Sequence, residues 1–305
     1  MNKIEIEYKV HFIPSSWEEM TVKQLSYLVG LYSRKLTDFE FRTLLIIYFL
    51  GWRRKVITYK DKMYWIPKYF RYFPLRSFVP FLISKGKYKE IDSTDLYLLI
   101  ETIDFVNKET PILHQNKLPV IKVGRFSKTK LFGPADDFSN CSYLEYAKTD
   151  VRFMRFFASE CKDINALNEL IAVIYRPKKW FLFFRKRLGS FNGDIRRNYN
   201  DIFVERYKNK INHLPWHTKY AIFLFVYGVR KQIEDDYPHI FQKTEESKSN
   251  GFGHAGIIVE LAGPKFGNPS ETAETPLHTI MIHLEQLSID AEEVRERNNL
   301  NIEEE

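Results

Sequence analysis

The sequence has few cysteines and no long hydrophobic run. Its two thiols, Cys141 and Cys161, stand twenty residues apart. Such a pair forms neither a metal-ligand cluster nor a disulfide framework, which indicates a reducing compartment, although a single bridge between the two stays open. The most apolar stretches, residues 44–50 and 221–229, are shorter than the ~20 residues that span a bilayer. We therefore expect a soluble protein that is not secreted and has no membrane partner.

Local signatures of catalysis are also missing. The sequence contains no GxSxG, no P-loop, and no HExxH or HxH motif. Residues 251–256 spell GxGxxG, but they follow a polar segment instead of a strand, so we interpret them as flexible glycines before a helix. His213 and His217 have a spacing that can bind metal, yet Pro215 between them indicates the start of a helix. We expect no catalytic residue, cofactor or metal site. An enzyme without a local signature is an alternative that ranks after the two binding functions given below.

Charge is distributed very unevenly along the chain. Residues 241–305 carry 5 basic and 13 acidic side chains, a net charge of −8, whereas residues 1–240 carry a net charge of +15. The basic part is also rich in aromatic residues, since the chain has 25 Phe and 18 Tyr. A basic body joined to an acidic end suggests an anionic partner, or contact between the two ends of one copy or of different copies.

Apolar residues recur at helical spacing through most of the chain, which predicts a mainly α fold. A helical bundle-like body is expected, with a small β-hairpin and short strands near the N-terminus and a small C-terminal helical module. Thr21 with Gln24, and Thr37 with Glu40, have the spacing of capping boxes that begin two helices of a hairpin. Further helices are predicted over 142–161, 165–175, 194–210, 216–235, 256–261 and 277–287. Strands are predicted over 3–12, over 56–59 with 63–66, and over 120–123.

Composition divides the chain into six segments. Residues 1–113 hold the helical hairpin and β-hairpin, and 114–137 form a polar connection with little periodicity. A central helical basic and aromatic region covers 138–242. Residues 243–250 are small, polar and charged, as in a linker. A C-terminal helical module over 251–287 and an acidic disordered tail over 288–305 complete the division.

The densest basic run is RPKKWFLFFRKRL, residues 176–188. Interleaved cations and aromatic rings suit nucleic acid, because cations contact phosphates while rings stack on bases. They equally suit an anionic membrane surface or a protein interface, or an exposed loop whose aromatic side chains are buried. Arg196 and Arg197 extend the patch if the fold joins them to it. The candidate partner-binding residues, for nucleic acid or protein, are Lys178, Lys179, Trp180, Arg185, Lys186 and Arg187.

Several longer stretches resemble a known group of viral proteins. These are WEEMTVKQL after Pro14, FSNCSYLEYAKTD at 138–150, LNELIAVIYRP at 167–177, and the two segments 216–241 and 251–287. In this order they resemble poorly characterised proteins of tailed bacteriophages and prophages encoded near the tail-tube and tape-measure proteins. The resemblance implies a tail-assembly chaperone or minor virion protein without catalysis or cofactor, in the host cytoplasm or in the virion.

Two functions follow as expectations. The first is a non-enzymatic tail-assembly or virion-associated protein that binds other virion proteins, such as the tail-tube or tape-measure protein. The alternative is a basic protein that binds DNA or RNA through residues 176–188. In that case the acidic tail would cover the basic patch within one copy. Homo-oligomers held by the basic body and the acidic tail are a further expectation.

Overall fold

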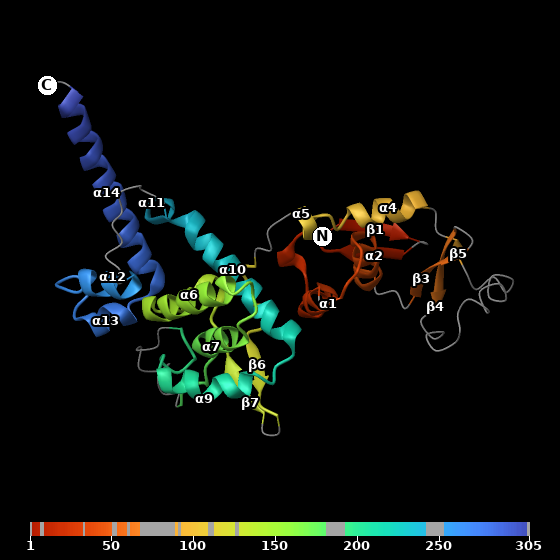
Figure 1. The fold of residues 1–305 in the computed structure, drawn as a ribbon, viewed down its shortest axis with the longest axis horizontal. Coiled ribbons are helices and arrows are strands. Elements are labelled where there is room, and N and C mark those ends of the chain that lie inside the picture. Colours follow the sequence, from red (N-terminus) through yellow and green to blue (C-terminus); the bar gives the residue numbers. More distant parts are fainter. Residues whose placement is uncertain are drawn as a thin grey trace. The chain divides into compact units, whose positions relative to one another are not determined.

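The chain forms two compact units, Met1–Pro111 and Ile112–Glu305, and each is described here by itself. The computed structural model describes residues 2–6, 9–32, 34–50, 54–59, 62–67, 89–90, 93–108, 113–125, 128–180, 193–241 and 253–303 (Figure 1). The fold is mainly helical, which confirms the predicted class. Within these ranges, no helix has the length and apolar character needed to cross a membrane.

The first unit combines helices with two small antiparallel sheets. Its strands pair in the orders β1-β2 and β3-β4-β5. Its elements are β1 (Asn2–Ile6), β2 (Lys9–Ile13), η1 (Trp17–Glu19), α1 (Val22–Tyr32), α2 (Asp38–Phe49), β3 (Arg54–Tyr59), β4 (Lys62–Pro67), β5 (Lys89–Glu90), α4 (Ser93–Glu101) and α5 (Phe105–Lys108).

Capping side chains begin both helices of the predicted helical hairpin. Thr37 accepts a hydrogen bond from the N–H of Glu40, whose side chain accepts the N–H of Thr37 in return. Thr21 and Gln24 exchange the same pair of bonds before α1. These bonds satisfy N–H groups that have no partner inside the helix, and they confirm the predicted helix starts.

The β-hairpin predicted at 56–59 and 63–66 is confirmed by β3 and β4, which pair from Arg54↔Pro67 to Tyr59↔Lys62. The single strand predicted over 3–12 is wrong, because β1 and β2 form an antiparallel pair of separate strands. Alternation of apolar and charged residues continues through both strands, so the pattern alone could not show where the chain reverses.

The second unit has a helical core with one β-hairpin on it. Its elements are β6 (Val120–Val123), β7 (Thr129–Phe132), η3 (Asp136–Phe138), α6 (Tyr143–Ala158), α7 (Ile164–Ile174), α9 (Asp201–Ile211), α10 (Trp216–Asp236), α11 (Pro238–Phe241), α12 (Gly253–Leu261), α13 (Pro269–Glu274) and α14 (Leu277–Glu303). β6 confirms the strand predicted at 120–123, and its pairing with β7 turns much of the predicted connection into regular structure.

Helix α7 is the centre of this unit. Residues 170–175 are all buried, and α6, α9 and α10 contact the helix from different sides. The second half of the helix, residues 170–174, is apolar on every side, which is typical of such a central position. Gly228 of α10 permits a close approach of the chain at Leu113, since a Cβ there would lie 2.3 Å from the backbone N of Leu113.

The segment before α9 differs from the prediction. A helix was expected over 194–210, but α9 begins at Asp201, with Asn200 as its N-cap. The preceding residues are extended: Arg197 N–H bonds to Pro177 O, and Lys179 N–H bonds to Ile195 O. Backbone pairing with residues 177–179 therefore replaces the first turns of the expected helix.

The C-terminal segment is part of the second unit instead of a separate module. The N–H of Leu277 bonds to Cys141 O, and that of Tyr143 bonds to Thr275 O, which joins α13 and α14 to the start of α6. Residues 288–303 continue helix α14, where a disordered tail was expected. Contact with α11, where His239 Nδ1 lies 2.8 Å from Glu292 Oε2, and the i,i+4 pair of Glu293 with Arg297 support the continued helix. The predicted linker, 243–250, lies outside the described residues.

Candidate functional site

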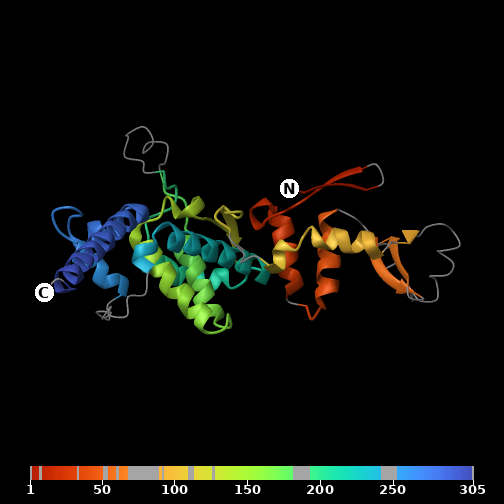
Figure 2. The same cartoon turned by 90° about the horizontal axis from the view of Figure 1, so that it is seen from above.

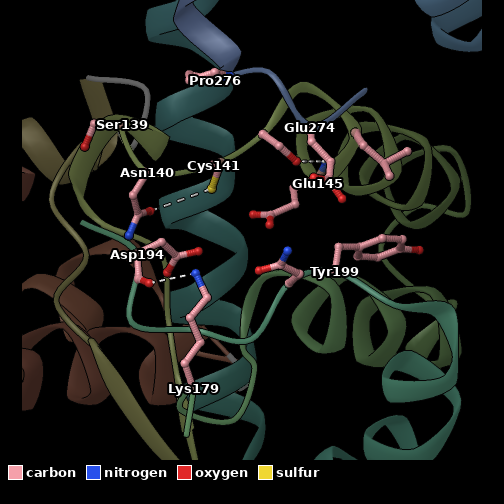
Figure 3. Close-up of a pocket in the computed structure, with 12 residues that line it drawn as sticks. Ser139, Asn140, Cys141, Glu145, Lys179, Asp194, Tyr199, Glu274 and Pro276 are labelled. Atoms are coloured by element: carbon pink, nitrogen blue, oxygen red, sulfur yellow. Dashed lines mark hydrogen bonds between the residues drawn. The ribbon is translucent and has the colours of Figure 1, made fainter. Parts of the chain in front are cut away.

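A polar cavity of about 140 Å³ opens beside the first turn of α6 (Figure 3). Its walls come from four parts of the sequence: the turn that leads into α6 with the first residues of that helix, Lys179, the extended segment before α9, and the chain from the end of α13 to Pro276. Such a volume holds a few water molecules or a small ligand. The lining residues include Ser139, Asn140, Cys141, Glu145, Lys179, Asp194, Tyr199, Glu274 and Pro276.

Two buried arginines neutralise the two buried carboxylates at this cavity. Arg176 Nη1 lies 2.5 Å from Glu145 Oε1, and its Nη2 lies 3.4 Å from Asp194 Oδ2. Arg196 Nε lies 2.8 Å from Asp194 Oδ1, and its Nη2 lies 3.1 Å from Glu145 Oε2. Every carboxylate oxygen of the pair thus faces a guanidinium. We define these four side chains as the arginine–carboxylate cluster.

This cluster ties distant segments together. Arg196 also donates to the carbonyl oxygens of Ile174, at the end of α7, and Asn140, before α6. Burial lowers the pKa of Arg196, but the adjacent acidic groups outweigh burial, so the pKa lies above its ordinary value. The guanidinium stays charged, and its role is to join these segments. Arg196 is fully buried, so it does not extend the surface patch as the sequence suggested.

Cys141 contributes no reactive thiolate to the cavity. Burial raises the pKa of its thiol to about 12, so the group is protonated at neutral pH. A nucleophilic cysteine needs a pKa near or below neutrality. Cys161 is also a free thiol, so the bridge that the sequence left open does not form.

A second chain of polar contacts joins α12 to α6 and α10. Tyr143 Oη lies 3.0 Å from His254 Nδ1, and His254 Nε2 lies 3.2 Å from Asp150 Oδ2. Arg230 Nε donates to the other oxygen of Asp150 at 2.7 Å. The order tyrosine, histidine, carboxylate resembles a proton relay, but burial raises the pKa of Tyr143, which keeps the phenol protonated. We infer that these contacts hold α12 in place.

The strongest exposed feature of the second unit is the cationic β6-β7 hairpin. Lys122 and Lys130 stand directly opposite each other in the register, and both are exposed. Arg125 and Lys128 follow at the end of the hairpin. Lys210 of α9 joins them, donating from Nζ to Thr129 Oγ1 at 3.2 Å. We define the cationic surface as Lys122, Arg125, Lys128, Lys130 and Lys210.

The repulsion between Lys122 and Lys130 is not relieved by an acidic side chain. Among the described residues, no carboxylate forms an ion pair with Lys122, Lys128 or Lys130. Like charges directly opposite each other destabilise an antiparallel pair, by roughly 0.2–1 kcal/mol. On the same face, Val120 is 42% exposed beside these cations. An anionic partner would relieve the repulsion and cover the apolar side chain.

The predicted partner-binding residues fall into three groups. Lys178 and Trp180 are exposed, and the exposed fraction of Trp180 is 71%. Arg197 lies over the Trp180 ring, with its Cζ 5.5 Å from the ring centroid. Lys179 is turned towards the cavity, where its Nζ donates to Asp194 O at 3.0 Å. Arg185, Lys186 and Arg187 lie outside the described residues.

Sequence reasoning missed the cationic surface because it weighed only the densest basic run. A signal was present: residues 110–135 contain five lysines and arginines and no acidic residue. The lack of periodicity in that stretch predicted a polar connection. Lys122 and Lys130 share one face only because β6 and β7 pair.

No metal centre was identified: across the described ranges, no group of three or more His, Cys, Asp or Glu side chains is placed to hold an ion. His213 and His217 belong to no such group.

No protein family, curated protein or solved structure matches this chain.

Proposed function

We propose that the protein is a non-enzymatic tail-assembly or virion-associated protein that binds an acidic surface of another virion protein. The single observation that carries the proposal is the cationic surface, on which Lys122 and Lys130 face each other without an acidic partner among the described residues. The biological setting comes from the resemblance to phage proteins encoded near the tail-tube and tape-measure proteins.

The composition of the surface favours a protein partner. Its cations attract an acidic patch, and the exposed Val120 supplies apolar area that contacts a folded surface. Electrostatic complementarity of this kind accelerates association and selects the partner more than it adds affinity. Binding should therefore be weaker at high salt, where exposed charges are screened within ~10 Å.

Capture of the tail proteins tests this function. The full chain, carrying an affinity tag, is incubated with purified tail-tube protein or tape-measure protein at low and high salt. We expect retention at low salt, and at least about a ten-fold loss of affinity in the double variant Lys122→Glu, Lys130→Glu, equivalent to about 1.4 kcal/mol. The double variant Lys23→Glu, Lys35→Glu changes two exposed lysines of the first unit and gives the same net charge.

Two results would contradict the proposal. One is the absence of retention of either tail protein at low salt. The other is an equal loss of affinity in both double variants, which would attribute binding to net charge and not to the cationic surface.

A second candidate function, binding of nucleic acid, is favoured by the Trp180–Arg197 contact. An exposed tryptophan beside a guanidinium offers a stacking platform for a base next to a cation for its phosphate. Trp180→Ala should then weaken binding of single-stranded DNA or RNA by ~1–3 kcal/mol, measured by fluorescence anisotropy. Lys178→Ala should reduce the dependence of affinity on salt, because one fewer phosphate is neutralised. Unchanged affinity and salt slope would rule this candidate out.

A further inference from the structure

Helix α14 carries an apolar stripe that continues beyond the core of the second unit. Ile280, Leu284, Leu287, Ala291 and Val294 follow one another at alternating spacings of four and three residues. Ile280 is fully buried, whereas Leu287 is 45% exposed and Val294 is 54% exposed. The same helix face is therefore covered at its beginning and uncovered towards its end.

The uncovered part is also the most acidic part of the chain. Residues 285–305 contain eight acidic and two basic residues, a net charge of −6. Helix α11 contacts this part from one side, where His239 Nδ1 lies 2.8 Å from Glu292 Oε2. Asp290 and Glu293 are exposed. The end of α14 thus combines exposed acidic and exposed apolar side chains.

The cationic surface, whose charge is opposite to that of this helix, lies on the same unit but too far from the helix to contact it. Both views place the end of α14 and the β6-β7 hairpin at opposite ends of the second unit (Figures 1 and 2). The backbone hydrogen bond from Leu277 N–H to Cys141 O holds the start of α14 against the start of α6. The acidic helix therefore does not cover the cationic surface of its own copy.

We propose that the end of α14 of one copy binds the cationic surface of a second copy. This inference rests on the proposed function and names the acidic partner as a second copy of the chain. Asp290 and Glu293 would approach Lys122 and Lys130, while Leu287 and Val294 would cover Val120. The lengths fit: residues 287–294 span about 12 Å of helix, and each strand of the hairpin spans about 13 Å.

The two contact surfaces are different, so this interface is heterologous. Each copy that uses its helix on one neighbour still presents its own cationic surface to another. Such head-to-tail contacts produce rings if the rotation closes and open chains if it does not. The assembly depends on charge, and it therefore dissociates as salt rises.

Sedimentation velocity of the full chain, freed of nucleic acid by nuclease treatment, tests the inference. We expect the weight-average mass to rise at least about two-fold with protein concentration at about 0.05 M salt, and to return to that of one chain at about 0.5 M salt. A mass equal to one chain at every salt and protein concentration would overturn the inference.

A charge exchange tests the surfaces themselves. The hairpin-reversed variant carries Lys122→Glu and Lys130→Glu, and the helix-reversed variant carries Asp290→Lys and Glu293→Lys. Each variant alone should remain a single chain, because the residues that are expected to meet, at 122 and 130 of one copy and 290 and 293 of the other, then carry charge of the same sign. An equimolar mixture should assemble again, since each surface meets one of opposite sign. A mixture that stays dissociated, while the wild type assembles, would show that other surfaces are used and would overturn the assignment.

A control variant tests for an effect of net charge alone, and the capture of tail proteins distinguishes failure of this inference from failure of the proposed function. Lys23→Glu with Lys35→Glu should assemble like the wild type; a loss of assembly there would reduce the effect to net charge and overturn the inference. If the hairpin-reversed variant loses the tail protein while the wild type never self-associates, the inference fails and the proposed function stands. If copies associate through these surfaces but no tail protein is retained, the proposed function fails alone.

Discussion

At the residue scale, the arginine–carboxylate cluster is stable only if its geometry is closely maintained. Arg176 and Arg196 are both within 1% of complete burial, together with two acidic partners. Removing charges from water is costly, and the mutual attraction compensates only when the geometry engages every charged group. Here each carboxylate oxygen faces a guanidinium, so the cluster specifies how α6, α7 and the segment before α9 fit together.

Arg196→Ala should therefore destabilise the protein strongly. It leaves the Glu145 and Asp194 charges buried with half of their partners, and breaking a buried ion pair in this way costs about 3–5 kcal/mol. Urea unfolding of the full chain measures the loss. Arg297→Ala serves as the control, because its ion pair with Glu293 is exposed and should contribute no more than about 0.5 kcal/mol. An unchanged urea midpoint for Arg196→Ala would contradict the structural role of the cluster.

Asp150 gives the protein a defined acid sensitivity. Burial raises the pKa of this carboxyl, but hydrogen bonds from His254 and Arg230 outweigh burial, and the pKa lies below its ordinary 3.8. The unfolded chain then binds the proton more readily than the folded one. The stabilisation is fully present above the ordinary value and is lost as pH falls through the lowered value.

Asp150→Asn should remove that stabilisation at neutral pH. We expect a loss of about 1.5–3 kcal/mol, the usual contribution of hydrogen bonds to a charged group. Unfolding curves recorded from neutral pH to below pH ~4 should show the difference between wild type and variant narrowing in the acid range. A difference that is constant with pH would mean that the Asp150 carboxylate charge is not what stabilises α12.

At the element scale, α14 is the part of the chain whose structure departs most from expectation. High charge and few aromatic residues in 288–305 are typical of disorder, which led to the expected tail. The helix continues instead, and its acidic residues are accompanied by Leu287 and Val294 on one face. Arg297 and Glu293 form an i,i+4 pair along its side, which supports the helix weakly.

Hydrogen exchange distinguishes a helix from a tail in this segment. Amides of residues 289–297 should exchange more slowly than those of an unstructured chain, because each bonds to a carbonyl one turn earlier. Ala291→Pro removes one such bond and introduces a clash, at a cost of ~3 kcal/mol, so protection around it should disappear. Identical, fast exchange in wild type and variant would indicate that the segment is disordered.

At the scale of the whole molecule, the two compact units correspond only partly to the charge division. The boundary near residue 111 lies within the basic part, and the acidic C-terminal segment belongs to the second unit. That unit consequently carries both the cationic surface and the acidic helix. A strong charge asymmetry within one folded body favours association between copies.

The second unit should fold by itself, because its core is formed by its own helices. Residues 112–305, expressed alone, should give amide resonances that overlay those of the same residues in the full chain, with shifts confined to the new N-terminus. A collapsed or unfolded spectrum would show that the first unit is needed for folding and would contradict the division.

The sequence by itself determined the local features of this protein. Hydroxyl and carboxylate or amide pairs at fixed spacing identified the starts of α1 and α2, and apolar spacing identified α6, α7 and α10, because these signals act within one or two turns. It also exposed the charge division.

Tertiary structure decided everything that depends on pairing between distant segments. Residues 194–200 became extended because they bond to 177–179, and Arg196 became a buried structural cation instead of a surface one. The cationic surface exists because β6 and β7 pair and bring lysines eight residues apart to face each other. Such contacts depend on burial and backbone pairing between distant segments, which no local pattern encodes.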